Sequence, residues 1–340
     1  MKAARLYGPR DLRIEEVPVP EVAGDQVLVQ MHSVGICGTD LLVYRGDLPV
    51  RPGTILGHEC AGVVAATGPD VQRHRVGDRV FVEAGWGCGS CVYCRRGLIL
   101  HCTHKASLGR TVDGAFAEYV AVPERVVHPI AENVPFDDAQ SASTIGSAIR
   151  ALGHIRPTVG DSAAVVGSGH AGLILMQLLR LSGLQWVAMV GTREKRLELA
   201  RELGADLVVD ARSDNPVEKV LEATEGLGVD LVGEAAATDS SLDLSMQIAA
   251  FGGTVLAFGI YEQAVKGFRA PDLYRKEIRL VGSKGGFGAY EATSQLLGRG
   301  ILRIRPLISH YFPLDELAEG FRMMDEKAQD ALRIVVRPCQ

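Results

Sequence analysis

From residue 163 onward, short apolar segments alternate with amphipathic ones, a pattern that few folds accommodate. Strands are predicted at 163–166, 186–190, 205–209, 229–232, 254–258 and 279–281, and helices at 171–181, 195–202 and 242–249. Strands separated by helices are joined by right-handed crossovers and pair in parallel. The sequence therefore predicts an α/β protein whose second half is a doubly wound parallel sheet.

The first of these strands leads directly into a G-x-G-x-x-G motif that opens an apolar helix. The motif comprises Gly167, Ser168, Gly169, His170, Ala171 and Gly172. Its first glycine permits the tight turn, the second lets the backbone approach a pyrophosphate, and the third allows close packing of helix on strand. Backbone N–H groups and the helix dipole then hold the phosphates. An ordinary strand-to-helix turn is the alternative, but this context favours a Rossmann-type dinucleotide site.

The end of the second strand determines which dinucleotide is preferred. An Asp or Glu there normally accepts a hydrogen bond from the ribose 2′-hydroxyl. This chain instead has Gly191, Thr192 and Arg193, with Lys195 close by. A small residue makes room for a 2′-phosphate, and an arginine offers it two donors. We therefore predict a preference for NADP(H); the alternative is that Arg193 caps a solvated turn and either cofactor is used.

The first half of the chain has a different pattern, of short β-rich segments separated by frequent turns. Strands at 26–34, 62–67, 79–83 and 116–122 predict a partly open barrel. Toward the C-terminus, helices are predicted at 290–297 and 314–324 and a strand at 332–336. At 340 residues the chain exceeds the size of a single core. We predict a barrel domain at 1–152, a cofactor domain at 153–288, and a segment at 289–340 that returns to the first domain.

Four cysteines, Cys88, Cys91, Cys94 and Cys102, lie within a predicted lobe at about 85–105. Their spacing suits tetrahedral Zn²⁺ bound by four thiolates, which leaves no ligand position open. The alternatives are disulfides or a nucleic-acid zinc ribbon. We expect neither, because no secretory leader is recognised and a net charge of −5 repels phosphate backbones. The remaining unassigned cysteines, Cys60 and Cys339, are predicted to be inert thiols.

The apolar stretches are interrupted by charges or glycines before they could span a bilayer. Together with the cysteine usage, this predicts a cytoplasmic protein with a small-molecule substrate and neither a nucleic-acid nor a membrane partner.

Two further motifs are Gly35-Ile36-Cys37-Gly38-Thr39-Asp40 and Gly57-His58-Glu59. With the four-cysteine lobe and the glycine motif in the same order, the chain resembles the zinc-containing medium-chain dehydrogenase/reductase family. It is most similar to the polyol, butanediol and threonine dehydrogenase branch. The resemblance extends over essentially the whole length, beginning at residues 8–16. It implies a GroES-like barrel domain, a Rossmann domain, and assembly as a homodimer or homotetramer.

The resemblance also implies roles for individual residues. Cys37 and His58 would be ligands of a catalytic zinc, and Glu59 a ligand that binds directly or after movement. Asp40 would orient the histidine, and Thr39 would pass the substrate proton toward solvent. An open zinc position polarises an alcohol or carbonyl oxygen during hydride transfer. The predicted cofactor-binding residues also include Gly259 and Arg333.

Two positions depart from the family pattern. Ser143 lies where the family supplies a further metal ligand, and a neutral hydroxyl is a poor zinc ligand. Asp137 and Asp138 are the nearest substitutes in the sequence. Leu42 replaces a histidine that often extends the proton path in polyol relatives, so the proton would leave through Thr39 and either water or the ribose.

The predicted function is that of a zinc-dependent, NADP(H)-preferring alcohol dehydrogenase or ketone reductase. A secondary alcohol is the expected substrate, with polyols and sugar-derived alcohols as candidates. One alternative is a zinc-free reductase of the same superfamily that keeps only the structural zinc, as the serine at 143 suggests. The other is a non-catalytic cofactor-binding protein. Two zinc ions per chain would support the first function, and one would support either alternative.

Overall fold

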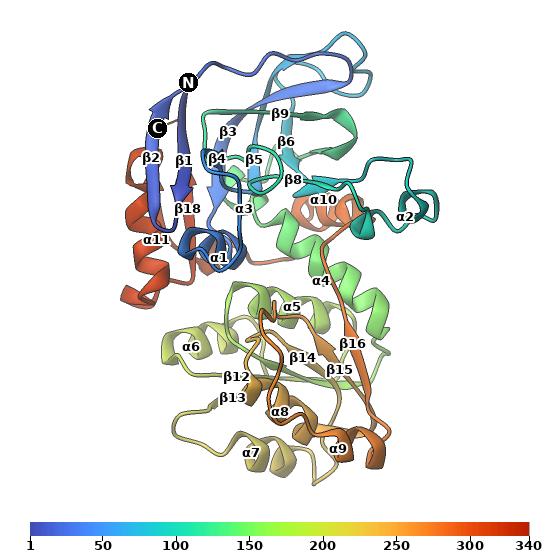
Figure 1. Ribbon diagram of the computed structural model, residues 1–340. Helices are drawn as coiled ribbons and strands as arrows, with labels where there is room; N and C mark the ends of the chain where they lie inside the picture. The colour runs from blue at the N-terminus through green and yellow to red at the C-terminus, as the bar shows by residue number, and fades with distance from the viewer. Residues whose placement is uncertain (340) are drawn as a thin grey trace. The chain divides into compact units, whose positions relative to one another are not determined.

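The computed structural model of the chain describes residues 1–339 and divides into two units, each with its own sheet and apolar core (Figure 1). The first unit contains Met1–Ser143 and the segment that begins at Phe287. The second unit contains Thr144–Gly286. Among the described residues, no helix is both long and apolar enough to cross a bilayer.

The second unit is built on six parallel strands in the order β13-β12-β11-β14-β15-β16. Helices α5 and α6 cover one face of this sheet, and α7, α8 and α9 cover the other (Figure 1). The elements are α4 (Ala142–Ile155), β11 (Ser162–Val166), α5 (His170–Leu181), β12 (Trp186–Gly191), α6 (Glu194–Glu202), β13 (Leu207–Asp210), α7 (Pro216–Ala223), β14 (Val229–Glu234), α8 (Asp239–Ile248), β15 (Ala249–Ala257), α9 (Ala270–Arg275) and β16 (Arg279–Gly282). The predicted doubly wound sheet is confirmed.

Burial explains why the central strands were recognisable. In β11 and β12, residues 163–166 and 187–190 are all buried, because helices cover both faces of the sheet. Such strands appear as continuous apolar runs. The prediction erred at β15, which begins at Ala249, where a helix was expected to end. Helices α4, α7 and α9 were not predicted.

The first unit contains a seven-stranded sheet in the order β10-β6-β5-β3-β18-β17, with β9 also paired to β3. A three-stranded sheet, β2-β1-β4, and a two-stranded sheet, β7-β8, accompany it. Its strands are β1 (Lys2–Gly8), β2 (Asp11–Glu16), β3 (Gln26–Gly35), β4 (Thr54–Ile55), β5 (Glu59–Thr67), β6 (Arg79–Val82), β7 (Gly85–Trp86), β8 (Ala106–Ser107), β9 (Tyr119–Pro123), β10 (Val127–Pro129), β17 (Ile308–Pro313) and β18 (Arg333–Arg337). Its helices are α1 (Gly38–Arg45), α2 (Val92–Arg95), α3 (Phe136–Ala139), α10 (Tyr290–Gly298) and α11 (Leu317–Asp325). Aromatic side chains, among them Phe116 and Phe321, fill the core beside these strands.

The C-terminal segment completes the sheet of the first unit. Strand β18 pairs antiparallel with β3, so that Val335 lies opposite Gly35, and β17 pairs parallel with β18.

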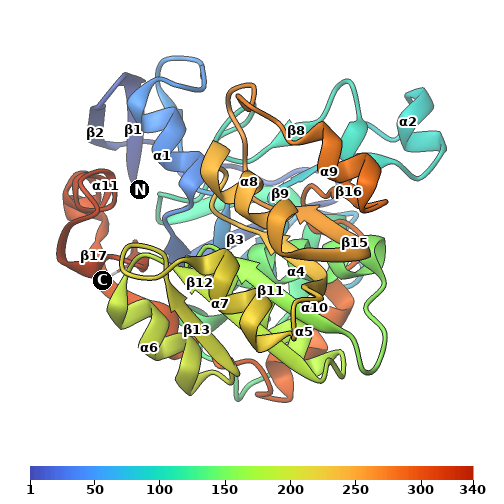
Figure 2. The ribbon, with the colours of Figure 1, turned by 90° about the horizontal axis from the view of Figure 1, so that it is seen from below.

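The structural division differs from the predicted boundary at 152, which falls inside α4. This helix buries Ile145, Ala148, Ala151 and Ile155 at helical spacing and belongs to the second unit from Thr144 onward. Figure 2 shows the ribbon of Figure 1 from below.

Candidate functional site

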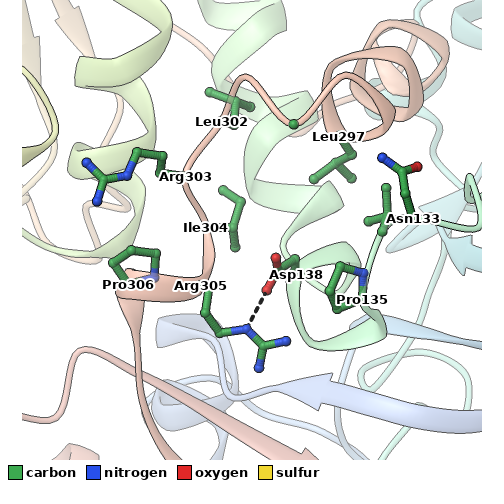
Figure 3. A pocket seen from close by; sticks show the side chains of 11 residues that line it. Asn133, Pro135, Asp138, Leu297, Leu302, Arg303, Ile304, Arg305 and Pro306 are labelled. Atoms are coloured by element: carbon green, nitrogen blue, oxygen red, sulfur yellow. Dashed lines mark ion pairs between the residues drawn. The ribbon is translucent and has the colours of Figure 1, made fainter.

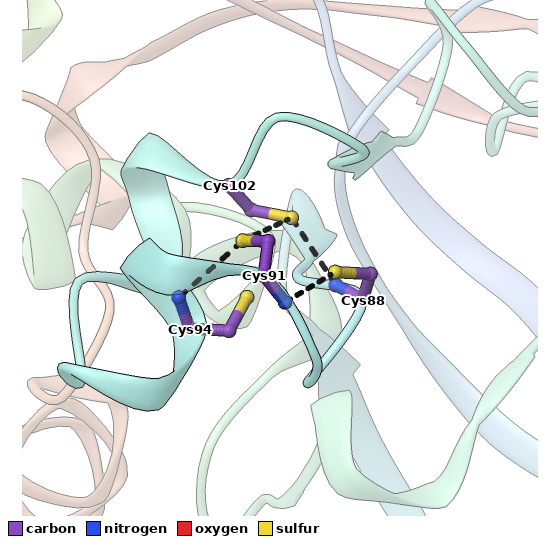
Figure 4. Close-up of side chains that lie close together, drawn as sticks. All are labelled: Cys88, Cys91, Cys94 and Cys102. Atoms are coloured by element: carbon purple, nitrogen blue, oxygen red, sulfur yellow. Dashed lines mark hydrogen bonds between the residues drawn. The ribbon is translucent and has the colours of Figure 1, made fainter.

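The four cysteines of the lobe point their sulfur atoms toward one another from the segment between β7 and β8 (Figure 4). All four sulfurs lie within 4.8 Å of one another, and the Cys91 and Cys102 sulfurs are 3.8 Å apart. A tetrahedron with Zn–S bonds of about 2.3 Å has edges of about 3.8 Å. A disulfide requires about 2.05 Å. The arrangement therefore fits a zinc ion and does not fit paired disulfides.

Backbone N–H groups around this cluster favour thiolates. The N–H of Cys88 donates to the Cys102 sulfur at 3.2 Å, and the N–H of Cys91 donates to the Cys88 sulfur at 3.4 Å. The Ser90 hydroxyl, aided by backbone amides, lowers the pKa of Cys88 to about 5, and the amide of Cys94 lowers the pKa of Cys91 to about 7. Burial raises the pKa of Cys94 to about 12, so its thiol would lose a proton when a cation binds. Four sulfur ligands would leave no position for substrate on a bound ion, so the group fits the predicted structural zinc.

We expect Cys91→Ser to lower the stability of the first unit without removing the catalytic step itself. The variant loses one of four thiolates, and structural zinc sites contribute folding free energy directly. The melting temperature should fall by about 5 to 15 °C, and the zinc content should fall by one ion per chain. Thermal melts paired with metal analysis test this. Wild-type stability with full zinc content would show that the cluster is not structural.

A second group of ligand atoms forms where β3 ends and β5 begins. Register pairing places Gly35 opposite Glu59, so that Cys37, two residues past the end of β3, meets His58 just before β5. One ligand atom each from Cys37, His58 and Glu59 lies within 4.8 Å of the others. A thiolate, an imidazole and a carboxylate form a donor set that zinc accepts, and three protein ligands leave a fourth position open. The residues therefore fit a catalytic zinc.

Asp40 organises this group from the first turn of α1. Its carboxylate accepts hydrogen bonds from the N–H groups of Cys37 at 3.0 Å and Gly57 at 3.3 Å, and lies 3.1 Å from Nδ1 of His58. With the Nδ1 proton directed at Asp40, Nε2 of His58 remains available to bind a metal. Burial lowers the pKa of His58, but the charges of Asp40 and Cys37 outweigh burial and raise it well above its ordinary value. The same anionic surroundings would stabilise a bound cation.

Glu59 is held by a buried network that the sequence did not reveal. Its carboxylate pairs with Arg333, which also donates to the side chain of Gln140 and, at 3.0 Å, to the carbonyl of Ile36. Glu59, Gln140 and Arg333 are all buried. A Cβ at Gly35 would lie 2.0 Å from the Arg333 guanidinium, so glycine leaves the space that this arginine fills. Arg333 was predicted to bind the cofactor; the structure places it beside Glu59, and its contact with cofactor stays a prediction.

The two aspartates nearest to the missing ligand in the sequence are paired with arginines. Asp137 pairs with Arg337 at 2.7 Å and Arg305 at 3.0 Å, and Asp138 pairs with Arg305 at 3.2 Å. Within residues 1–339, the His, Cys, Asp and Glu group that includes Cys37 contains only His58 and Glu59 besides it. Ser143 is buried near the start of α4. Neither aspartate belongs to this group, and a catalytic zinc held by Cys37, His58 and Glu59 stays a prediction.

Thr39 and Leu42 lie in α1, and the two cysteines predicted to be inert lie in β5 and after β18. The Cys37 thiol lies 3.8 Å from the Thr39 hydroxyl, and Leu42 is half-buried one turn further along α1. Cys60 is buried, and desolvation raises the pKa of its thiol to about 12, as expected for an inert residue. Burial also raises the pKa of Cys339.

A cavity of about 270 Å³ lies elsewhere in the first unit (Figure 3). The ion pair between Arg305 and Asp138 lies in its wall, as Figure 3 shows. Its lining residues are Asn133, Val134, Pro135, Asp138, Leu297, Gly300, Leu302, Arg303, Ile304, Arg305 and Pro306. None of the predicted metal ligands contributes to it, so this cavity is not the catalytic site.

In the second unit, the glycine motif has the geometry that phosphate binding requires. Gly167 has a positive φ of 117°, and a Cβ on Gly172 would lie 1.9 Å from the Gly167 carbonyl oxygen. Gly169 caps the N-terminus of α5, and a Cβ there would meet nothing within 4 Å. The first and third glycines are thus required by the protein's own packing. The second faces open space, where backbone N–H groups at the helix start can receive a phosphate.

The end of β12 excludes a carboxylate at the position that reads the ribose. A Cβ at Gly191 would lie 2.3 Å from the Ser168 hydroxyl, so only glycine fits without rearrangement. Thr192 and Lys195 are exposed, and Arg193 caps the N-terminus of α6. On the neighbouring strand, Asp210 lies opposite Gly191 but is bound by both donors of Arg212, at 3.0 and 2.6 Å, which lowers its pKa to about 2. The remaining predicted residue, Gly259, follows β15.

Each of the two units contains a segment that matches a known protein family. Residues 23–132 match the alcohol dehydrogenase GroES-like domain family, and residues 171–299 match the zinc-binding dehydrogenase family. An L-threonine 3-dehydrogenase from Bacillus velezensis is 31% identical over 92% of this chain and 91% of its own length. A sorbitol dehydrogenase from Bacillus subtilis is 29% identical over 99% of this chain and 97% of its own. A structure from Sinorhizobium meliloti, described as a zinc-binding dehydrogenase bound to NADP, has a TM-score of 0.94 at 29% identity and covers 99% of both chains.

These relationships extend over nearly the entire chain and include both the metal-binding motifs and the cofactor fold. They confirm the resemblance, the GroES-like and Rossmann folds and the class of enzyme that the sequence predicted. The chain belongs to the zinc-binding, medium-chain alcohol dehydrogenase family of oxidoreductases, in the branch that contains threonine and sorbitol dehydrogenases.

Proposed function

We propose that this protein is a zinc-dependent, NADP(H)-preferring dehydrogenase of secondary alcohols, including polyols, and that it also reduces the corresponding ketones. The observation that carries the proposal is the convergence of Cys37, His58 and Glu59, with Asp40 bonded to the histidine. When bound, zinc polarises the substrate oxygen and the nicotinamide exchanges a hydride with the adjacent carbon.

The protein's own groups would hold the reactants and conduct the proton. Asp40 fixes the His58 ring so that Nε2 faces the ligand group, and Arg333 holds the Glu59 carboxylate beside it. The Thr39 hydroxyl lies close to Cys37 and can accept the proton that an alcohol loses. Since Leu42 has no proton to exchange, we propose that the path continues from Thr39 through water or the cofactor ribose.

The NADP(H) preference is supported by the charges at the end of β12. Gly191 carries no carboxylate that would repel a phosphate, Arg193 and Lys195 supply positive charge, and Arg212 neutralises the neighbouring Asp210. A phosphate group binds such a surface through charge-assisted hydrogen bonds, whereas a bare ribose hydroxyl gains little from it.

Arg193→Ala is expected to raise the KM for NADPH by roughly 10- to 150-fold, because one charge-assisted contact contributes about 1.5 to 3 kcal/mol. The KM for NADH should hardly change, since the lost group contacts only the 2′-phosphate. Steady-state kinetics with both cofactors and one ketone provide the test. An equal effect on both would show that Arg193 does not read the phosphate.

The serine at 143 gives weight to one alternative, a reductase without catalytic zinc. Metal analysis distinguishes the two, because the proposed enzyme carries two zinc ions per chain and the alternative carries one. If ketone reduction proceeds with one zinc per chain, Thr39 becomes the residue to substitute next.

We also propose that the enzyme assembles as a homodimer or homotetramer in the cytoplasm. The support is the family resemblance and the presence of seven cysteines outside disulfides, which suits a reducing compartment. Light scattering of the purified protein would measure its oligomeric state.

A panel of secondary alcohols, polyols and amino alcohols would identify the substrate.

A further inference from the structure

Glu234, at the end of β14, is a fully buried carboxylate with no part in the functions assigned above. Its Oε1 accepts hydrogen bonds from the N–H groups of Ala236 and Ala237, both at 2.8 Å, and from the Ser241 hydroxyl at 2.7 Å. Its Oε2 accepts a hydrogen bond from the Tyr261 hydroxyl at 2.6 Å. A buried carboxylate is costly unless donors surround it, and four donors surround this one.

These bonds fix the shape of the loop at 235–237. Ala237 adopts a positive φ of 54°, which a residue with a Cβ disfavours. The Glu234 carboxylate offsets the cost of this backbone conformation, because it accepts hydrogen bonds from two successive N–H groups of the loop. Ser241 lies in the first turn of α8, and its hydroxyl also accepts from the N–H of Thr238, so that Glu234 ties the loop to the start of that helix.

The loop packs between two glycines at the cofactor edge of the sheet. A Cβ on Gly167, the first glycine of the motif, would lie 2.9 Å from the backbone of Ala235 and Ala236. A Cβ on Gly259 would lie 2.9 Å from the backbone nitrogen of Ala237. Strand β14 pairs with β11, and Glu234 is in register with Val166, the residue before the motif. A displaced loop would therefore change the space beside the phosphate-binding turn.

Strand order indicates which half of the cofactor this loop meets. The residues that read the adenosine ribose follow β12, on one side of β11, whereas the loop follows β14 on the other side. A dinucleotide lies across this switch point, so its nicotinamide half extends over the β14 side. We propose that Glu234 is a positioning residue that holds the loop at 235–237 in the shape that accepts the nicotinamide half of the cofactor. This inference rests on the proposed use of a nicotinamide cofactor.

The experiment compares two ligands on each variant. NADPH carries both halves of the cofactor, whereas adenosine 2′,5′-bisphosphate carries only the adenosine half. Glu234→Ala should weaken NADPH binding tenfold or more, because the loop loses charge-assisted hydrogen bonds, and should weaken binding of the bisphosphate much less. Cofactor fluorescence and calorimetry measure the two dissociation constants, and zinc content and melting temperature are recorded alongside.

Two control variants separate positioning from general stabilisation. Glu234→Gln keeps an oxygen that can accept the two N–H bonds and should restore NADPH binding. Tyr261→Phe removes a donor from the other carboxylate oxygen and should leave NADPH affinity close to that of the wild type. If Glu234→Ala does not fold, Glu234→Asp takes its place in the experiment. Its shorter side chain withdraws the carboxylate from the loop, so NADPH binding should weaken and bisphosphate binding should change much less.

Wild-type affinity for NADPH in a folded Glu234→Ala or Glu234→Asp protein would overturn the inference, as would an equal loss for both ligands. If the wild-type protein binds neither NADPH nor NADH, the proposed function fails and the inference fails with it. If it binds NADH alone, only the NADP preference fails, and the same comparison with NADH and ADP decides the role of Glu234.

Discussion

A Cys37→Ala protein is expected to carry one zinc ion per chain and to lose turnover by ~10³-fold or more. The substitution removes the thiolate from a group of only three donor residues, His58 and Glu59 being the others. Lewis-acid activation by a metal contributes several kcal/mol to transition-state stabilisation, and about 4 kcal/mol corresponds to ~10³ in rate. Zinc per chain after dialysis against a mild chelator, measured together with ketone reduction, provides the result.

Ser143→Ala is the matched control, because Ser143 holds the position from which the family supplies a further ligand. It should keep both zinc ions, since a neutral hydroxyl contributes little to zinc binding. Ser143→Asp should instead retain the catalytic zinc against higher chelator concentrations, and Glu59→Gln should lose it more easily. Retention of two zinc ions and full activity in Cys37→Ala would contradict the assignment, as would loss of the second zinc in Ser143→Ala.

Gly172→Ala is expected to lower the melting temperature by about 5 °C or more and to abolish measurable cofactor binding. The added methyl group would lie 1.9 Å from the Gly167 carbonyl oxygen, a backbone atom that cannot move without opening the phosphate turn. Overpacking of this kind typically costs about 1 to 3 kcal/mol. Thermal melts and a titration with NADPH measure the two effects.

Gly169→Ala provides the comparison, because a Cβ at that position meets no protein atom within 4 Å. Its melting temperature should stay near that of the wild type, while its cofactor affinity should fall as the methyl group occupies space that a pyrophosphate needs. Equal destabilisation by the two variants would show that the second glycine has a structural role and does not face the cofactor.

Local periodicity and spacing were enough to predict several features of the fold and the site. The central strands of the second unit are continuous apolar runs because helices bury both their faces, and the glycine motif marks the turn after β11. The four cysteines lie within a 15-residue stretch, so a local turn is enough to bring their sulfurs together. Gly191 likewise shows, from its position alone, that the second strand of this sheet ends without a carboxylate.

The pairing of buried charges between distant residues, in contrast, became known from the folded structure. Arg333 contacts both Glu59 and Gln140 because β18 returns to pair with β3, and no local pattern encodes contacts between residues so far apart. Asp137 and Asp138 likewise pair with arginines that the C-terminal segment brings back to the first unit. Burial makes these pairings obligatory, since an unpaired charge in the interior is costly, but which partner satisfies each charge depends on how the chain crosses itself.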